Sequence, residues 1–314
     1  MAVFQVRFLL ILPSCSPRRD CKLIKTDLFN ITCSKHLIWN SPANRMSLSY
    51  LTLQQKQRYS AKCGGVEFAD GYDGSSGKQQ SPINILKEMV DYDQTLKASQ
   101  LKFSYTVGDV KTIETLGSSW GCQCRDASSV KSARALTGTH LPAVYRFREF
   151  HGHWGNTEED GSEHRIHGRA FSGELHFTFW NPKYKKYKRC LDQPDGVAIL
   201  AVFLLANEND NENFRPLLTG IEESMAIESP VDLAKEFDLS RLLPEKLFYY
   251  TYEGSLTAAP FNECVIWTVL HRPVPIGISQ LDVLRTVTGD NARAMQEVNG
   301  RRVRSSFKLV PKKK

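Results

Sequence analysis

The sequence predicts a mixed, β-dominated fold class: a single domain with a large twisted, mostly antiparallel central sheet and short peripheral helices. Three observations support this prediction. From about residue 63, short segments rich in aromatic and β-branched residues alternate with Gly and Ser. Two of these segments contain almost no polar residues, and patterns with helical spacing are few and short.

The predicted strands follow one another along the chain, with turn residues between them. Their bounds are 101–105, 144–154, 174–180, 198–205 and 263–269. The apolar runs Val197–Leu205 and Cys264–Leu270 suit central strands that are buried on both faces. Helical spacing of apolar residues predicts three short helices, at Pro216–Ala226, Pro230–Phe237 and Ser279–Val287.

The N-terminal part of the chain lacks this texture. Residues 1–62 are predicted to be an irregular extension, disordered or used for targeting, before a domain at 63–308 and a basic tail at 309–314. The apolar run Phe8–Leu12 is short for a signal-peptide core, and Asp20 and Asp27 are atypical of a mitochondrial leader. We expect a cytoplasmic protein, with secretion or mitochondrial import as alternatives if residues 1–30 are a targeting segment.

Composition argues against several classes of protein. With 41% hydrophobic and 24% charged residues, the chain is typical of soluble globular proteins, and we expect no membrane span. The net charge of +7 comes from cations that are scattered along the chain, so we expect no nucleic-acid binding. The eight cysteines form no disulfide framework, and we expect most of them to be reduced.

Histidines and glutamates recur at every second position of two predicted strands. Because side chains alternate across a strand, Glu149, His151 and His153 share one face. Glu174 and His176 share a face of the next strand in the same way. If the two strands pair, three imidazoles converge on one point. Three neutral nitrogens hold zinc and leave a fourth tetrahedral position for water, which is the pattern of a catalytic zinc site.

Several further segments, in the same order, resemble those of alpha-class carbonic anhydrases. The resemblance covers residues 75–308 and rests on the motifs Gln80–Ile85, Tyr145–Arg146, Phe150–Gly155, Gly161–His164, Glu174–His176, Asp195–Gly196, Tyr252–Thr257, Glu263–Trp267 and Asn299–Val303. It implies reversible hydration of carbon dioxide to bicarbonate and a proton, by attack of zinc-bound hydroxide. It also implies binding of sulfonamide and anion inhibitors, and we expect a monomer.

The resemblance implies a role for each residue of the site. The zinc ligands correspond to His151, His153 and His176. The residues that support these ligands correspond to Glu149, Glu174 and the hydrogen-bonded His164. The catalytic pair corresponds to Thr257, whose hydroxyl meets the zinc-bound hydroxide, and Glu163, which directs that hydroxyl. The walls of the carbon dioxide pocket correspond to Ile199, Leu256, Val265, Trp267, Thr178 and Ala258.

The chain departs from the family pattern at several of these positions. Ser118 stands where fast members carry a proton-shuttle histidine, and serine does not titrate near neutrality. Glu149 replaces the usual Gln, which is expected to raise the pKa of zinc-bound water. Gly152 replaces an aromatic residue, so we expect looser packing behind the ligand strand. Thr178 brings a hydroxyl into the pocket, and Ala258 removes one from it.

These departures leave a second interpretation open: a zinc-bearing but weakly active or inactive binding protein related to carbonic anhydrases. The complete histidine triad, together with Thr257 and Glu163, favours the active enzyme instead. Secreted and membrane-bound members carry a disulfide whose positions correspond to Ser75 and Phe261 in this chain. That difference favours a cytoplasmic protein.

Overall fold

The computed structural model describes residues 77–124 and 134–309 of the chain. The predicted extension at 1–62 and residues 310–314 of the predicted tail lie outside the described residues. The predicted domain boundaries therefore stay predictions. Within the described part, the cysteines at positions 122, 124, 190 and 264 are free thiols.

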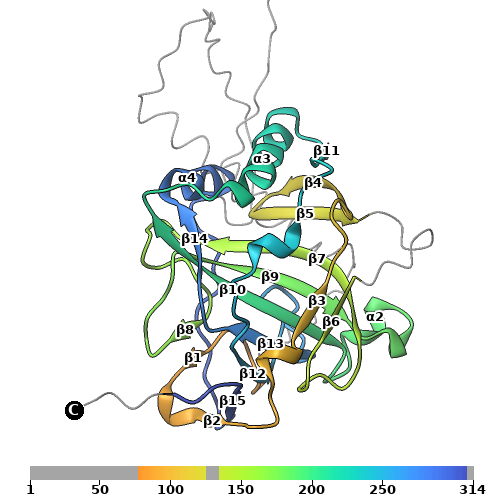
Figure 1. The fold of residues 1–314 in the computed structure, drawn as a ribbon, viewed down its shortest axis with the longest axis vertical. Helices are drawn as coiled ribbons and strands as arrows, with labels where there is room; N and C mark the ends of the chain where they lie inside the picture. Colours follow the sequence, from red (N-terminus) through yellow and green to blue (C-terminus); the bar gives the residue numbers. More distant parts are fainter. Residues whose placement is uncertain (1–76, 125–133, 310–314) are drawn as a thin grey trace, which may run out of the picture. The chain divides into compact units, whose positions relative to one another are not determined.

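A ten-stranded sheet dominates the described structure (Figure 1). The strands lie in the order β2, β15, β12, β13, β10, β9, β7, β6 and β3, and β14 also pairs with β10. Their bounds are β2 Val90–Tyr92, β15 Val303–Ser305, β12 Tyr249–Gly254, β13 Val265–Leu270, β10 Val197–Asn207, β9 Gly173–Trp180, β7 Tyr145–Trp154, β6 Ala135–Thr137, β3 Lys102–Ser104 and β14 Val274–Gly277. Most pairings are antiparallel, and β10–β13, β10–β14 and β15–β2 are parallel. The predicted fold class is confirmed.

The two apolar runs form adjacent central strands, β10 and β13, as the sequence predicts. The first eight residues of β10 and all six of β13 are buried. Such strands are covered on both faces, which explains why their sequences show almost no alternation of apolar and polar residues. They hold the neighbouring strands β9 and β7, which carry the histidines, in the interior of the sheet.

Smaller sheets and short helices surround this sheet. The smaller sheets pair β1 Asn84–Ile85 with β8 Arg165–Ile166, and β4 Val110–Leu116 with β5 Ser119–Cys124 and β11 Val231–Asp232. The helices are α2 Tyr187–Cys190, α3 Arg215–Ile227 and α4 Ile278–Val287, with single 3₁₀ turns at η3 Lys87–Met89, η4 Ala98–Gln100, η5 Pro182–Tyr184, η6 Glu212–Phe214 and η7 Leu239–Leu242. The predictions of helices at 216–226 and 279–287 are confirmed.

The third predicted helix, Pro230–Phe237, is wrong. Val231 and Asp232 form the short strand β11, which pairs antiparallel with β4. The pairing continues as the Leu233 N–H donates to the Lys111 carbonyl, so β4 satisfies backbone groups that a helix would have satisfied internally. Leu233 and Phe237 are buried. These two apolar residues are four positions apart, which is the spacing of a helix face. In the structure they instead bury an irregular segment against the core.

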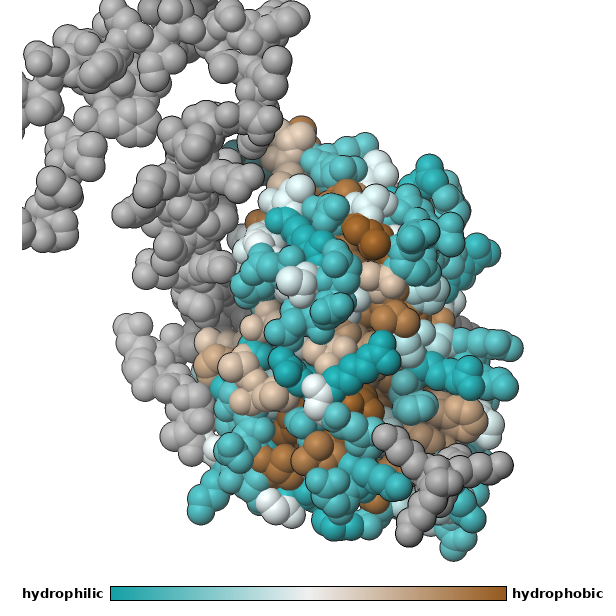
Figure 2. Space-filling view, turned by 90° about the vertical axis from the view of Figure 1, so that its left-hand side faces the viewer, coloured by the Kyte–Doolittle hydropathy of each residue, from teal (hydrophilic) through white to brown (hydrophobic). Residues whose placement is uncertain are grey.

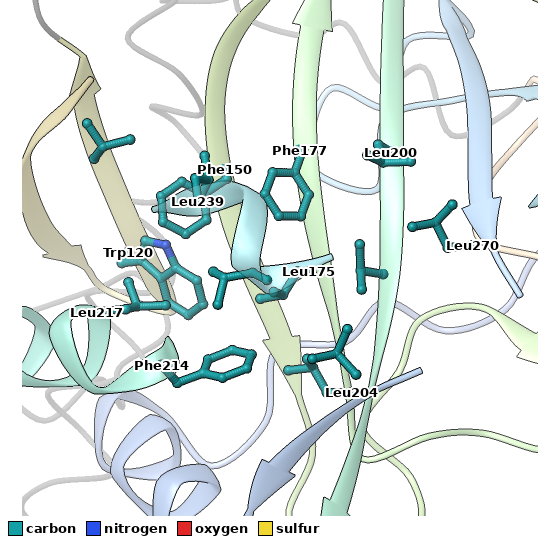
Figure 3. Packing of buried hydrophobic residues seen from close by; sticks show 14 of the residues in the cluster. Trp120, Phe150, Leu175, Phe177, Leu200, Leu204, Phe214, Leu217, Leu239 and Leu270 are labelled. Carbon is teal, nitrogen blue, oxygen red and sulfur yellow. The ribbon is translucent and has the colours of Figure 1, made fainter. Parts of the chain in front are cut away.

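The faces of the central sheet carry different kinds of side chain. On one face, aromatic and aliphatic residues of β7, β9 and β10 pack against β5, α3 and α4 in a large hydrophobic cluster. Figure 3 shows Phe150 and Phe177 of this cluster beside Trp120, with leucines around them. The opposite face carries the histidines, next to a second cluster that includes Ile199 and Trp267.

The surface of the described residues is mixed in polarity. On the face in Figure 2, hydrophobic residues occur in small patches among hydrophilic ones. Among the helices of the described ranges, none is both long and apolar enough to cross a bilayer.

Candidate metal centre

Register between β7 and β9 brings the three predicted ligand histidines together. His151 lies directly opposite His176, and His153 lies one alternation further along the same face. The ring centres of His151 and His153 are 5.1 Å apart, those of His151 and His176 are 5.2 Å apart, and those of His153 and His176 are 4.6 Å apart. One nitrogen from each ring lies within 4.8 Å of the other two, so the three could hold a metal ion.

Each of these imidazoles uses its other nitrogen for a hydrogen bond to an oxygen acceptor. His151 Nδ1 lies 3.0 Å from Glu149 Oε2, and His176 Nε2 lies 2.8 Å from Glu174 Oε1. His153 Nδ1 lies 3.2 Å from the backbone carbonyl of Asn291. An acceptor at the outer nitrogen keeps the proton there and leaves a lone pair on the inner nitrogen.

Two of the inner nitrogens are buried without any hydrogen-bond partner. They are Nε2 of His153 and Nδ1 of His176. An unpartnered buried nitrogen costs free energy, and a metal ion at the centre would satisfy both. The donor set of three neutral imidazoles matches the preference of catalytic zinc sites. The residues present therefore fit a zinc ion.

Burial keeps the imidazoles of His153 and His176 neutral. It lowers the pKa of His176 to about 4, and the nearby imidazole of His151 contributes to this fall. Burial also holds the pKa of His153 well below its usual value, together with repulsion from His176 and His151. Neutral imidazoles are the protonation state that binds metal, so the site is prepared for an ion at neutral pH.

Glu174 joins His176 to a second buried histidine. Its carboxylate accepts from the His164 ring at 2.7 Å and from the His164 backbone N–H at 2.8 Å. The other nitrogen of His164 lies 2.6 Å from the Tyr252 hydroxyl, which donates to Ser81 Oγ at 2.9 Å. This chain of hydrogen bonds fixes the position of Glu174 and, through it, the ring of His176.

Glu163 is a buried carboxylate beside the histidines. Its Oε1 accepts from the Arg293 backbone N–H at 2.8 Å and lies 3.3 Å from His153 Nδ1. Burial and the charge of Glu174 hold its pKa well above the usual range. The Thr257 side chain opposes this rise in pKa, and Glu163 Oε2 is buried without a hydrogen-bond partner among the described residues. The predicted catalytic pair thus lies together.

Glu149 and Thr178 are opposite one another on β7 and β9. Burial raises the pKa of Glu149, but His151 and a hydrogen bond from the Thr178 side chain lower it to about 2. The Thr178 hydroxyl, which the sequence places in an apolar pocket, therefore donates a hydrogen bond to Glu149. The two departures from the family pattern compensate each other, since the extra carboxylate and the extra hydroxyl form one hydrogen-bonded pair.

Three of the six predicted pocket residues occupy one row across the sheet. Thr178, Ile199 and Trp267 are direct neighbours on β9, β10 and β13. The Trp267 ring contacts the His176 ring edge-on, with ring centres 4.9 Å apart. Val265 belongs to the same hydrophobic cluster, and Leu256 packs against it. Ala258 lies in the half-buried loop after β12, near Thr257.

Ser118 lies in the turn between β4 and β5, near the ligand strand. Its backbone carbonyl accepts from the Asn291 side chain at 2.7 Å, and the same Asn291 amide donates to the Gly152 carbonyl at 2.9 Å. Asn291 therefore links the predicted shuttle position to β7. The side chain of Ser118 is half-buried and offers no group that titrates near neutrality.

The expectation of loose packing at Gly152 is wrong. A Cβ atom built on Gly152 would lie 2.3 Å from the Trp120 ring. This indole is fully buried and stacks on Trp154, with ring centres 5.8 Å apart and an interplanar angle of 3°. A tryptophan from β5 thus fills the space that an aromatic residue at position 152 would occupy, and Gly152 is required by that close approach.

Asn291 and Arg293 contribute to the site, but no sequence pattern predicted them. Both follow α4 in a segment without periodic pattern, and they reach residues more than a hundred positions earlier in the chain. Their contacts to His153 and Glu163 are made by the Asn291 carbonyl and the Arg293 N–H, backbone groups that side-chain identity does not reveal. The motif Asn299–Val303 lies close by in sequence and was the nearest available signal.

Comparison with known proteins matches the chain to one family. The family model for eukaryotic-type carbonic anhydrase matches residues 64–307. Carbonic anhydrase 3 of Homo sapiens is 32% identical over 262 residues, which is 80% of this chain and 98% of that protein. Carbonic anhydrase 3 of Equus caballus is 36% identical over 251 residues, 76% of this chain and 93% of that protein. Carbonic anhydrase 3 of Mus musculus is 34% identical over 264 residues, which is 80% of this chain and 98% of that protein.

Proposed function

The chain belongs to the eukaryotic-type carbonic anhydrase family, and on this premise we propose that it hydrates carbon dioxide reversibly to bicarbonate and a proton. We propose zinc as its cofactor, held by His151, His153 and His176. The observation that carries the proposal is the arrangement of the three imidazoles. Their outer nitrogens are hydrogen-bonded to oxygen acceptors, and the inner ones converge.

Zinc supplies Lewis acidity, which in carbonic anhydrases lowers the pKa of water to about 7. The role of the chain is to keep the three ligands neutral, oriented and preorganised. Glu149, Glu174 and the Asn291 carbonyl hold the outer N–H groups. Acceptors of this kind typically change metal affinity about 10–100-fold when they are removed.

Thr257 and Glu163 would orient the attacking nucleophile through hydrogen bonds. Glu163 would accept a hydrogen bond from the Thr257 hydroxyl, so that the lone pairs of the Thr257 oxygen are left to accept a hydrogen bond from the attacking nucleophile. A cation among the histidines would favour the ionised form of Glu163, against the rise in its pKa caused by burial. The apolar surfaces of Ile199 and Trp267 would hold carbon dioxide and exclude competing water.

The proton made in each cycle must reach solvent, and Ser118 cannot carry it. We therefore expect turnover that depends on external buffer. Adding imidazole should raise the rate of carbon dioxide hydration at saturating substrate, whereas Ser118→His should raise it without imidazole. Rates that do not change with buffer concentration in the unmodified protein would contradict this role for Ser118.

Stopped-flow measurement of carbon dioxide hydration on the zinc-loaded protein tests the proposed function. We expect turnover that an aromatic sulfonamide inhibits and that His151→Ala abolishes. The matched control is His167→Asn, which removes an exposed imidazole and keeps a residue that tolerates the positive φ of 53° at that position. One bound zinc per chain without turnover above buffer would reject the enzyme and favour the zinc-bearing binding protein.

Location and assembly stay predictions of the sequence. A monomer is expected in light scattering of the purified chain, and a cytoplasmic distribution is expected for the full-length protein in cells. A secreted or imported product would require a targeting segment within residues 1–30, which lie outside the described residues.

A further inference from the structure

Two cysteines lie on the same face of β5, one alternation apart. Cys122 and Cys124 flank Gln123, which is exposed. Because side chains alternate along a strand, both thiols point inward where Gln123 points to solvent. Cys122 lies opposite Ile113 of β4, and both cysteines pack against the hydrophobic cluster on the face away from the histidines. Each is only half-buried, so small molecules from solvent have access to the pair.

The two thiols are in direct contact. A hydrogen bond between them, together with burial, raises the pKa of Cys122 well above its usual value. The same bond lowers the pKa of Cys124, and the Arg134 cation, which also pairs with Asp109 at 3.6 Å, lowers it further. Cys122 therefore keeps its proton and donates toward a Cys124 sulfur with thiolate character. The thiolate is the form of cysteine that attacks and ligates soft centres.

The spacing of the two sulfurs allows one small centre to bind both. With metal–sulfur bonds of about 2.3 Å, two sulfur ligands of one metal lie at most about 4.6 Å apart. Thiols in hydrogen-bond contact satisfy this limit. Among the described residues, the groups of three or more potential metal ligands both lie at the histidine centre. The cysteines thus offer two ligands without a third, which suits a soft centre with substituents of its own better than a structural zinc ion.

We propose that Cys122 and Cys124 form a dithiol site that captures trivalent arsenicals and similar thiophilic centres with two exchangeable positions. An arsenical R–As(OH)₂ would exchange both hydroxyl groups for sulfur, first at Cys124 and then at Cys122. Two As–S bonds form, two As–O bonds break, and the hydroxyl groups leave with the thiol protons as two water molecules. Arsenic stays trivalent, so the exchange needs neither an oxidant nor a reductant. The inference is independent of the proposed function, because the thiols lie on the other face from the histidines.

Phenylarsine oxide tests the site on the reduced, zinc-loaded, full-length chain. Intact mass spectrometry should show a bound phenylarsenic group that replaces two hydrogens. Peptide mapping should place this group on the peptide that contains both cysteines. Dimercaptopropanol should remove it, whereas a monothiol at the same thiol concentration should not, because two sulfurs hold the arsenic.

Two variants and one control locate the effect. Cys122→Ala and Cys124→Ala each leave a single thiol on β5, and the affinity of this site should fall about 10²–10⁴-fold in both, because the second sulfur binds intramolecularly. The control Cys190→Ala removes a buried thiol that donates to the Asn181 carbonyl and belongs to the other hydrophobic cluster, and binding should persist. Zinc content and urea unfolding report whether each variant is folded.

The site is overturned by any of three results. These are the absence of an adduct on the β5 peptide, separate adducts on each cysteine, and tight binding there that survives in Cys122→Ala or Cys124→Ala. None of them would bear on carbon dioxide hydration, which depends on the histidines.

Discussion

The two faces of β7 and β9 are built from alternate residues of the same strands, yet they are stabilised in different ways. On the metal face, His151, His176 and their neighbours are polar groups held by specific hydrogen bonds. On the core face, Phe150 and Phe177 stack with ring centres 6.0 Å apart within the large hydrophobic cluster. A position and its neighbour in sequence can therefore have unrelated effects when they are changed.

The two faces also accommodate departures from the family pattern differently. On the core face, volume is conserved, since the Trp120 ring occupies the space at Gly152. On the metal face, hydrogen bonding is conserved, since Thr178 donates to the carboxylate introduced at Glu149. Packing requires only that space be filled, whereas a buried polar group requires a partner of the right type.

The largest effect is expected on the core face. Trp120→Ala should lower the free energy of unfolding by about 3–5 kcal/mol, because Gly152 offers no side chain to reduce the cavity. Urea unfolding of the zinc-free protein measures this loss. Zinc stoichiometry should stay at one per chain, because the histidines are on the other face.

A double-mutant cycle provides the control. Gly152→Phe alone should destabilise by about 1–3 kcal/mol through its clash with Trp120. In the Trp120→Ala background the same change should restore part of the lost stability, because the new ring fills the cavity. Additive losses in the double mutant would show that the two positions do not share one space.

The next effect is a pH dependence that both faces share. Burial lowers the pKa of His176 to about 4 on the metal face, and that of His140, beneath the other face, to about 3. Below about pH 6.5 the unfolded histidines bind protons that the folded ones do not, so stability falls as pH decreases toward 4. In the zinc-free protein the contribution of His176 is on the order of 3 kcal/mol.

Urea unfolding of the zinc-free protein between pH 7 and pH 4.5 measures this loss. Variants His176→Asn and His140→Asn should each flatten the pH dependence, while His167→Asn, at an exposed position, should leave its slope as it is. A stability that does not change over this range would contradict the buried neutral state of both histidines.

A smaller effect is expected from Glu174→Gln. Glu174 Oε1 accepts from the rings of His164 and His176, and Oε2 accepts from the His164 backbone N–H, so an amide, whose nitrogen only donates, leaves at least one of these donors unpaired. Zinc affinity should fall about 10–100-fold, which is about 1.4–2.7 kcal/mol. Competition with a chelator measures this affinity, and Glu223→Gln on the exposed side of α3 serves as the control. An unchanged affinity would exclude Glu174 as a positioning residue.

The smallest effect is a shift of the pH–rate profile. Glu149→Gln should lower the midpoint by up to about one pH unit, because a neutral acceptor leaves His151 less electron-rich and removes a negative charge near the metal. Thr178→Val should shift it in the opposite direction, since Glu149 then loses a hydrogen-bond donor. Shifts of the same sign in both variants would disprove the coupling of these two residues.

Alternation along the strands allowed much of this protein to be predicted from sequence. The spacing of His151 and His153 placed two imidazoles on one face of a strand and that of Glu174 and His176 placed a third on a face of the next, while the runs in β10 and β13 indicated buried central strands. These are local properties, because a strand places its side chains by backbone geometry alone. The helix predicted at Pro230–Phe237 was wrong for the opposite reason: pairing with β4, a non-local contact, outweighed the local spacing of apolar residues.

Only the tertiary structure decided which distant groups complete the site. Asn291 lies 138 residues after His153, and Arg293 lies 130 residues after Glu163, yet each supplies a hydrogen bond there. The position of the Trp120 ring against Gly152 likewise depends on how separate segments pack. The sequence determined which side chains each strand presents, and the path of the chain determined what each of them meets.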